Sequence, residues 1–352
     1  MPHTTPAATI GVVGGGQLAR MLGEAAGPLG VEVVVSDPTP DCPAAPVVRD
    51  QVVGDFDDRA ADTPVHPDPD TLRTIQDKLV QNRALTDAGI PVPAFRGVDT
   101  AAELRAAGEE LGWPLMLKAR EGGYDGRGNF PVESPDDAEA AVAETGPAVV
   151  EELVDFEREL AVIGVKGKDE VRAFPVTETV HEAEILRELV TPARTAPAVR
   201  ERAREVALEV LETLDGRGVY GIELFELNDG EILVNEIAPR PHNSGHWTIE
   251  GAHSSQFEQH ARAVLGWPLG SAERRAPSVT TNVLGDVEDP QPAELSGVEA
   301  VLEAPAASLH WYGKREVRPL RKMGHVTLSN ADSDAETLLE RARELRDGLT
   351  FT

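Results

Sequence analysis

Apolar and polar residues alternate in blocks over the first part of the chain, in a pattern typical of strands that lead into helices. Residues 9–13 form an apolar run, three glycines follow at 14–16, and the next turns carry apolar residues at helical spacing. A second apolar run at 31–37 ends in Asp37. This order predicts a βαβ unit with a glycine-rich turn at a helix N-terminus, which is a place suited to phosphate.

The middle of the chain combines one helical pattern with strands that end in charged residues. Residues 71–89 predict a helix closed by a glycine cap. An apolar run at 114–118 predicts a strand that ends in Lys118, and a loop with four glycines follows at 122–128. The backbone of such a loop can approach phosphates closely, or the loop can be a plain flexible hairpin. A further strand at 148–150 leads directly into two glutamates.

The strongest turn signal lies further on, where Asp229 and Gly230 separate two apolar runs. This dipeptide between apolar runs predicts a tight β-hairpin. A two-residue turn would pair Asn228 with Glu231, and this pairing sets the register of both strands.

In that register Leu224 faces Asn235, and Glu223 faces Glu236. Like charges directly opposite each other are destabilising, and a divalent cation between the two carboxylates would remove the repulsion. Oxygen ligands suit Mg²⁺, which usually keeps positions for water and nucleotide phosphates. The alternative is a hairpin whose end is wet, with both acids in solvent.

A dense polar loop follows the second strand of this hairpin. It contains Arg240, His242, Asn243 and Ser244, with two prolines and a glycine to restrict the backbone. Loops that carry chemistry lie at the ends of rigid strands, so this loop is a candidate functional segment. A solvated polar loop is the alternative.

The composition limits the class of function. A chain of 352 residues is long enough for two or three domains. The formal net charge of -28 argues against nucleic acid or an anionic membrane as a general partner. The acidic residues are spread along the chain and lysines are few, which we interpret as the surface of a protein from a high-salt cytoplasm.

The compartment is expected to be a reducing cytoplasm. Cys42 is the single cysteine, so no internal disulfide is possible. No apolar run reaches the length of a membrane span, and the N-terminus lacks a signal-peptide pattern.

Basic residues gather near the C-terminus of this otherwise acidic chain. They lie at 310–314 and 318–325, and they include Lys314 and Arg321. Binding an anion such as a substrate phosphate is one explanation, and local pairing with surface acids is the other.

Together these motifs resemble the 5-(carboxyamino)imidazole ribonucleotide synthase family of the ATP-grasp superfamily. The resemblance runs through nearly the whole chain. The segments that carry it are 14–18, Lys118 with 122–128, 235–246, and 311–314 with 321–325. The first segment is the least specific of these.

The resemblance implies an α/β fold, α+β in the centre, with three domains. These are a Rossmann-like N-terminal domain at 1–90, an ATP-grasp domain at 91–270 and a small β-rich C-terminal domain at 271–352. It implies an ATP-dependent ligase of purine biosynthesis, which carboxylates the amine of 5-aminoimidazole ribonucleotide with bicarbonate through carboxyphosphate. ATP and Mg²⁺ are the implied cofactors, small molecules the partners, with no nucleic acid or membrane, and a homodimer the assembly.

The resemblance also implies a role for individual residues. The residues that would bind ATP are Lys78, Lys118, Gly123, Tyr124, Asp125, Gly126, Arg127, Gly128, Asn129, Glu151, Glu152, Leu153, Val154, Glu159, His181, Asn235 and Glu236. Those that would hold the ribonucleotide are Gly15, Gln17, Tyr124, Asp125, Arg127, Lys314 and Arg321. Glu223 and Glu236 would bind magnesium, and the catalytic residues at the bicarbonate would be Arg240, His242 and Asn243.

The N-terminal domain departs from the family pattern. Asp58 is followed after only five residues by Pro64, which leaves no room for a further helix and strand that the family has there. We therefore expect this domain to lack one βα unit near 59–63.

Three alternatives stay open. The first is another ATP-grasp ligase. The second is an NAD-dependent dehydrogenase, because Gly14, Gly16 and Ala19 with Asp37 match the dinucleotide-binding fingerprint. The third is a catalytically impaired nucleotide-binding protein, which the missing βα unit could produce.

Overall fold

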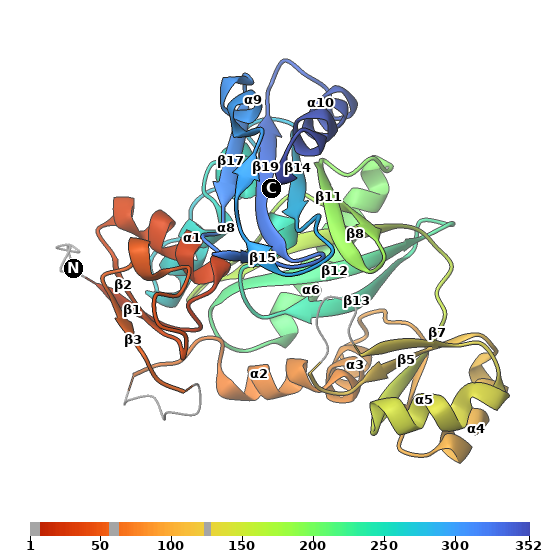
Figure 1. Ribbon diagram of the computed structural model, residues 1–352. Coiled ribbons are helices and arrows are strands. Elements are labelled where there is room, and N and C mark those ends of the chain that lie inside the picture. The colour runs from red at the N-terminus through yellow and green to blue at the C-terminus, as the bar shows by residue number, and fades with distance from the viewer. Residues whose placement is uncertain (1–7, 56–62, 123–127) are drawn as a thin grey trace.

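The computed structural model describes residues 8–55, 63–122 and 128–352 (Figure 1). The N-terminal region is a parallel three-stranded sheet in the order β1-β2-β3, with α1 packed on it. The elements are β1 Thr9–Val13, α1 Gln17–Ala26, β2 Glu32–Ser36 and β3 Asp50–Val52. The predicted βαβ opening is confirmed, and the described part of this sheet has three strands.

The single helix predicted over 71–89 is wrong, because the chain forms two helices there. They are α2 Pro69–Gln76 and α3 Lys78–Asp87. Asp77 leaves the helical conformation between them, and its carboxylate accepts hydrogen bonds from the N–H groups of Leu79 and Val80. An aspartate at this position caps a new helix, which offers the backbone an alternative to a continuous helix.

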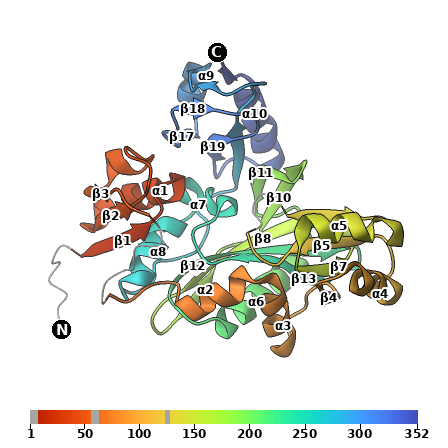
Figure 2. The ribbon, with the colours of Figure 1, turned by 60° about the horizontal axis from the view of Figure 1, so that its bottom comes forward.

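A small antiparallel sheet follows, in the order β4-β7-β5-β6. Figures 1 and 2 show it beside the larger part of the molecule, with α4 and α5 on its outer face. Leu104 of α4 packs on Leu115, Leu117 and Val150 of the strands, all of them buried. The elements are β4 Phe95–Val98, α4 Ala101–Leu111, β5 Leu115–Ala119, β6 Asn129–Val132, α5 Ala138–Thr145 and β7 Ala148–Glu152.

A nine-stranded sheet forms the centre of the molecule, in the order β13-β12-β8-β10-β11-β14-β19-β17 with β9 paired to β8. Its pairing continues from β11 into β14 across the predicted boundary at 271. The strands are β8 Phe156–Lys166, β9 Val171–Ala173, β10 Thr177–Glu182, β11 Ile185–Thr191, β12 Gly218–Leu227, β13 Ile232–Ala238, β14 Ser278–Leu284, β17 Ala307–Trp311 and β19 Lys322–Ser329.

Helices cover both faces of this sheet, and the alternation of side chains along β8 shows how. Leu160 and Val162 pack toward α6 Pro197–Thr213, whereas Ile163 and Val165 pack against Trp247 on the other face. The second face also carries α7 Thr248–Gly251 and α8 Gln256–Val264. A sheet buried on both faces explains the nearly continuous apolar runs in these strands.

The C-terminal region adds helices and short strands to the far end of the sheet. Arg343 and Arg346 of α10 both bind the buried Glu188 of β11, at 2.6 and 3.0 Å. The remaining elements are β15 Gln291–Pro292, β16 Leu295–Ser296, α9 Val298–Glu303, β18 Glu316–Val317, α10 Ala335–Asp347 and β20 Thr350–Phe351.

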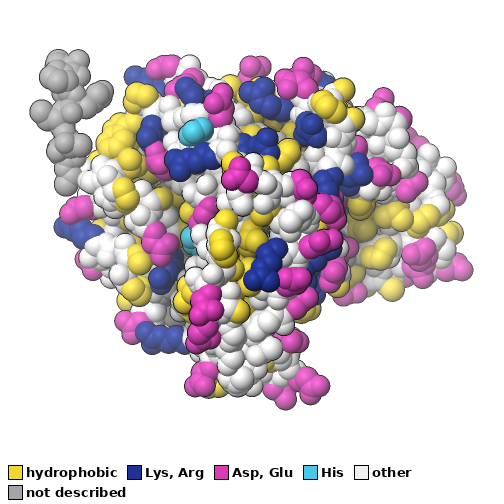
Figure 3. All heavy atoms as spheres, turned by 90° about the horizontal axis from the view of Figure 1, so that it is seen from above, with side chains coloured by type: hydrophobic (Ala, Val, Ile, Leu, Met, Phe, Trp, Pro, Cys, Tyr) yellow, Lys and Arg dark blue, Asp and Glu magenta, His cyan; other side chains and the backbone are white. Residues whose placement is uncertain are grey.

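Charged side chains are dispersed over the surface. Figure 3 shows Asp and Glu (magenta) scattered across one whole face, with Lys and Arg (dark blue) among them. In the part of the chain that the structure describes, no helix is both long and apolar enough to cross a membrane.

Candidate functional site

The hairpin of β12 and β13 places two carboxylates opposite each other. Glu223 pairs with Glu236, so this part of the predicted register is confirmed. Leu224 pairs with Val234, so the prediction that it faces Asn235 is wrong.

Two irregularities with opposite effects explain this result. The turn is one residue longer than predicted, because Leu227 donates to the carbonyl of Glu231 and Gly230 donates to that of Leu227. A β-bulge between Glu223 and Leu224 then takes up Asn235 as an extra residue on β13 and restores the predicted register. Bulges commonly re-aim a side chain beside an active site, and here the bulged residue is Asn235.

The two opposed carboxylates destabilise each other's charge. Burial, and next the neighbouring charge of Glu236, raise the pKa of Glu223 to about 7. The side chain of Glu223 is 24% exposed and that of Glu236 42%. The described residues contain no group of three or more Asp, Glu, His or Cys side chains arranged to hold a metal. Two carboxylates with solvent access nevertheless fit Mg²⁺, which fills its other positions with water and phosphate oxygens.

Lys118, at the end of β5, lies between the small and the large sheet. It is 6% exposed, and its Nζ donates to Oδ1 of Asn235 at 2.9 Å and lies 2.7 Å from Oε2 of Glu151. The other oxygen of Glu151 accepts a hydrogen bond from Asn82 of α3 at 2.9 Å. Lys118 of the small sheet therefore connects the bulge residue Asn235 of the large sheet with Glu151.

Lys78 lies at the start of α3 and approaches Glu236, one of the two opposed carboxylates. Its Nζ is 3.4 Å from Oε1 of Glu236. Its backbone N–H donates to the carbonyl of Arg120 at 3.0 Å, and the Arg120 guanidinium binds both oxygens of Asp77. These contacts attach the start of α3 to the end of β5, and they keep the two lysines on one side of the site.

The strand connection from β7 to β8 forms another edge of the site. Glu152 accepts a hydrogen bond from the N–H of Ala94 at 2.8 Å, Leu153 is exposed, and Val154 is partly buried. Open backbone with an exposed apolar side chain suits contact with a flat apolar ring such as a purine base.

Glu159 of β8 and His181 of β10 form a hydrogen-bonded pair on the same sheet. Nδ1 of His181 lies 2.7 Å from Oε2 of Glu159. Burial alone would lower the pKa of His181, but the hydrogen bond and charge of Glu159 outweigh it, and the pKa is raised. Glu159 also acts on the pKa of Glu223, which places the pair beside the opposed carboxylates.

The glycine-rich loop is only partly described. Gly128 has a φ of 87° and accepts a hydrogen bond from the N–H of Ala119, and Asn129 pairs with Lys118 across β5 and β6. The loop therefore begins and ends beside Lys118. The predicted site residues Gly123, Tyr124, Asp125, Gly126 and Arg127 lie outside the described residues.

The polar loop after β13 carries two neutral side chains, His242, which is partly buried, and Asn243, which is buried. Nδ1 of His242 lies 2.9 Å from the hydroxyl of Ser244. Burial, and next the charge of Arg240, hold the pKa of His242 well below its usual range, so the ring is uncharged at neutral pH. Asn243 is 6% exposed, and neither atom of its amide has a hydrogen-bond partner among the described residues. A buried amide in that state is available to a small polar ligand.

The basic C-terminal cluster reaches the N-terminal region. Nζ of Lys314 donates to Oε1 of Gln17 at 2.9 Å and to the carbonyl of Lys322. Arg321 donates to the carbonyl of Glu316 at 2.8 Å, and burial and then Arg318 lower its pKa. Arg321 also lies 3.9 Å from Oε1 of Glu316, so local pairing with a surface acid accounts for part of this basic cluster.

In the glycine turn after β1, close packing explains the glycine at position 15. A Cβ atom at Gly15 would lie 2.2 Å from the sulfur of Cys42. The carboxylate of Asp37 accepts hydrogen bonds from the N–H groups of Gly15 and Thr39, at 2.7 and 2.8 Å. The acid that a dehydrogenase would direct at a ribose is thus bound to its own turn, which argues against the NAD alternative.

Sequence reasoning missed two residues of this region. The charge of Lys322 acts on the pKa values of Glu223 and His242, so it lies near both. The position of Lys322 in the basic C-terminal cluster was the feature of the sequence that could have identified it. Gln256 of α8 hydrogen-bonds the backbone of His242, and no local pattern could have shown this contact.

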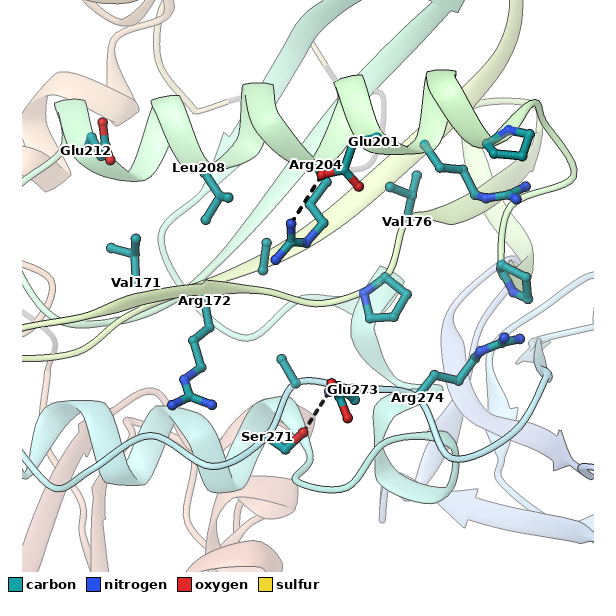
Figure 4. A pocket seen from close by; sticks show the side chains of 16 residues that line it. Val171, Arg172, Val176, Glu201, Arg204, Leu208, Glu212, Ser271, Glu273 and Arg274 are labelled. Carbon is teal, nitrogen blue, oxygen red and sulfur yellow. Dashed lines mark hydrogen bonds and ion pairs between the residues drawn. The ribbon is translucent and has the colours of Figure 1, made fainter.

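A hollow of about 670 Å³ lies elsewhere (Figure 4). It is lined by residues of β9, α6 and 271–274, among them Arg204, Leu208 and Arg274. Because Ile222 and Leu224 pack toward α6, Glu223 between them faces the other side of the sheet. The hollow is therefore separate from the site described above.

Comparison with protein families matches three segments of the chain. Residues 7–72 match the ribonucleotide synthetase preATP-grasp domain, and residues 83–257 match the ATP-grasp domain. Residues 278–341 match the phosphoribosylaminoimidazole carboxylase C-terminal domain.

Individual proteins match over nearly the whole length. An N5-carboxyaminoimidazole ribonucleotide synthase of Brucella melitensis is 39% identical over 92% of this chain and 96% of its own. The carboxyaminoimidazole ribonucleotide synthase of Aspergillus clavatus, solved with ATP, superposes with a TM-score of 0.87 at 37% identity, over 97% of this chain and 98% of its own. A structure of that enzyme with ADP and 5-aminoimidazole ribonucleotide gives 0.85 at 36%, over 97% and 99%.

Proposed function

The chain belongs to the N5-carboxyaminoimidazole ribonucleotide synthase family of ATP-grasp ligases, and we propose how its residues carry out that reaction. The enzyme joins a carboxyl group to the amine of 5-aminoimidazole ribonucleotide. Bicarbonate supplies the carboxyl group, and ATP supplies the phosphoryl group that activates it. The products are ADP, phosphate and the N-carboxylated ribonucleotide. The observation that carries the assignment to this site is the opposed Glu223–Glu236 pair with Lys78 and Lys118 beside it.

The first step transfers the γ-phosphoryl group of ATP to an oxygen of bicarbonate. ADP leaves and carboxyphosphate forms, so a poor electrophile becomes a reactive one. Phosphoryl transfer depends mainly on positioning and on neutralising charge, and Lys78 and Lys118 supply positive charge at the phosphates. Glu223 and Glu236 would hold Mg²⁺, which neutralises further charge on the phosphate oxygens.

The adenosine part of ATP is assigned to the edge made by the β7–β8 connection. Leu153 and Val154 would contact the base, with Glu151 and Glu152 at its edge, and Glu159 would accept hydrogen bonds from the ribose hydroxyls. The hydrogen bond between Glu159 and His181 orients that carboxylate. Gly123 to Asn129 would close over the phosphates and exclude water from the reactive intermediate.

Bicarbonate is assigned to the loop after β13. Arg240 would bind its negative charge, and the free amide of Asn243 and the neutral ring of His242 would supply hydrogen bonds. Carboxyphosphate then breaks between carbon and the bridging oxygen, releasing phosphate and carbon dioxide. The ribonucleotide amine forms the new C–N bond and loses one proton.

The ribonucleotide is assigned to the junction of α1 with the C-terminal cluster. Lys314 and Arg321 would bind its phosphate, and Gly15 and Gln17 would form the wall of the pocket. Tyr124, Asp125 and Arg127 would complete it from the glycine-rich loop.

Four further proposals concern the whole molecule. Domain boundaries near residues 90 and 270, a homodimer and a cytoplasmic location are proposed from family membership. The acidic, lysine-poor surface is proposed to suit a high-salt cytoplasm, so stability should rise steeply with molar KCl, and a melting temperature independent of salt would oppose this.

The test is ADP release by the purified protein with Mg²⁺ and bicarbonate, in low and in molar KCl, with and without 5-aminoimidazole ribonucleotide. We expect the ribonucleotide to stimulate ADP release and to yield one carboxylated product per ADP. Absence of stimulation in both salts would overturn the proposed reaction. Binding of a nicotinamide nucleotide in place of ATP would favour the dehydrogenase.

A further inference from the structure

Gln256, the first residue of α8, is fully buried below the loop that carries His242. Its Oε1 accepts a hydrogen bond from the N–H of His242 at 2.9 Å, and its Nε2 donates to the carbonyl of the same residue at 2.7 Å. One side-chain amide thus binds both backbone groups of His242, whose carbonyl also accepts from the N–H of Gly245 at 3.0 Å. Such hydrogen bonds stabilise a buried peptide group, because a donor or acceptor that is buried without a partner costs free energy.

These two bonds also define which way the amide points. The N–H of His242 requires an acceptor and its carbonyl requires a donor, so a reversed amide would lose both bonds. Nε2 of Gln256 also lies 3.3 Å from Nδ1 of His246. Nδ1 of His246 is therefore the acceptor, and the proton of this neutral ring is on Nε2.

Close packing leaves the loop little freedom around this amide. A Cβ atom at Gly245 would lie 2.6 Å from Oε1 of Gln256, and a Cβ atom at Gly221 of β12 would lie 2.5 Å from Cβ of His242. The hydroxyl of Thr248 accepts from the N–H of Gln256 at 3.0 Å and donates to the carbonyl of Gly245 at 2.6 Å. The loop is enclosed between β12 and the start of α8.

The imidazole of His246 extends this contact into the C-terminal strands. Its ring stacks on His325 of β19 at 4.7 Å between centroids, and His325 stacks on His310 of β17 at 4.5 Å. The ring of His246 also stacks on that of Phe257 at 5.9 Å between centroids. The loop is thus held from α8 and from the strands that carry the basic C-terminal cluster.

We propose that Gln256 is a positioning residue for the carboxylation reaction, which fixes His242 and Asn243 at the bicarbonate position through the backbone of His242. The inference rests on the proposed function of this loop. Gln256 contacts no reacting atom itself. Its amide sets the path of the peptide on either side of His242, and a displacement of about 1 Å can cost on the order of 10²-fold in rate.

The chain supplies a matched control on the same helix. Gln259 is also fully buried, and its amide bridges the backbone of Gly270, donating to the carbonyl at 2.8 Å and accepting from the N–H at 2.9 Å. The two glutamines share residue type, helix, burial and bonding pattern, but only Gln256 binds the loop of His242.

The experiment compares Gln256→Glu with Gln259→Glu in the full-length protein. Each substitution keeps the shape and removes the donor, so both should lower the melting temperature by similar amounts. Only Gln256→Glu should raise the KM for bicarbonate, by about 10-fold or more, with ATP affinity unchanged. It should also release more ADP than it forms carboxylated product, because misplaced carboxyphosphate hydrolyses. Gln256→Met, which loses both bonds, should show the same defects more strongly.

Two outcomes separate this inference from the function on which it rests. Wild-type protein that shows no ribonucleotide-stimulated ADP release would remove the function. Active wild type, with Gln256→Glu and Gln259→Glu alike in KM for bicarbonate and in the ADP-to-product ratio, would show that Gln256 only stabilises the fold. If Gln256→Glu does not fold, the folded Gln256→Met variant decides between the same two outcomes by the same ratio.

Discussion

The two halves of the site are built in different ways. On the ATP side, Lys78 and Lys118 are paired with carboxylates of the site itself, Glu236 and Glu151. On the bicarbonate side, His242 is uncharged and is held by neutral hydrogen bonds from a buried amide. The first half contains charges that can exchange partners when a charged ligand binds, whereas the second half fixes the geometry of His242 by neutral hydrogen bonds and has Arg240 as its charged group.

This difference predicts different sensitivities. Ion pairs respond to ligand charge, and the partly exposed ones also respond to salt. Buried neutral hydrogen bonds respond to shape and to the loss of a donor or acceptor. Substitutions in the two halves should therefore be separable by what they change.

The largest effect is expected at Lys118. Lys118→Met removes a charge at the ATP phosphates and should lower kcat by about 10³-fold, measured as ADP release. It also leaves Glu151 buried without its partner, which should cost about 3–5 kcal/mol of unfolding free energy.

The double variant Lys118→Met/Glu151→Gln separates these two effects. It should recover most of the stability and none of the activity. Recovery of activity as well would mean that Lys118 serves the fold and not the phosphates.

A smaller effect is expected in the neutral half, at His242. His242→Ala should lower kcat/KM for bicarbonate by about 10²-fold and leave the Kd for ATP unchanged, measured by calorimetry. Because the pKa of His242 is well below its usual range, this ring should contribute no step to the rate profile between pH 6 and 8. Ser244→Ala, which removes only the hydroxyl beside Nδ1, is the milder control. A loss of ATP binding in His242→Ala would show that the halves are not separate.

Sequence reasoning found the parts of this site that local patterns encode. The Asp229-Gly230 turn led to the opposed Glu223 and Glu236, although the pairing of Leu224 was wrong because a longer turn and a bulge compensate for each other. The strand that carries Lys118 near its end was also predictable, since its apolar run is unambiguous.

Other features depend on contacts between distant segments, which no local pattern reveals. The break at Asp77 was missed because helical periodicity continues through it, while the carboxylate both caps α3 and binds Arg120. The glycine turn matched a nucleotide fingerprint, but its acid, Asp37, is bound to the turn itself, and Gly15 packs on Cys42. Gln256 acts only through the fold, so its residue type gave no signal.

The smallest effect, on the stability of the metal-free protein, concerns the carboxylate pair where both halves meet. The folded-state pKa of Glu223 is raised to about 7, above its ordinary value of 4.5, by burial and then by Glu236. The fold therefore favours the protonated acid. The contribution of this protonation to the free energy of unfolding is fully present at pH below about 4.5, and it is lost as pH rises through about 7.

We therefore expect metal-free wild type to melt a few degrees lower at pH 8 than at pH 6, in calorimetry at constant ionic strength. Glu223→Gln should remove most of this difference, because a neutral amide resembles the protonated acid. Mg²⁺ needs the ionised form, so its affinity for wild type should rise as pH increases through about 7, and Glu223→Gln should bind it weakly at both values. Asp229→Asn, an exposed acid in the same hairpin, is the control and should leave both dependences unchanged. An equal pH effect in wild type and Glu223→Gln would show that another group titrates and that the pKa of Glu223 is not the cause of this pH dependence.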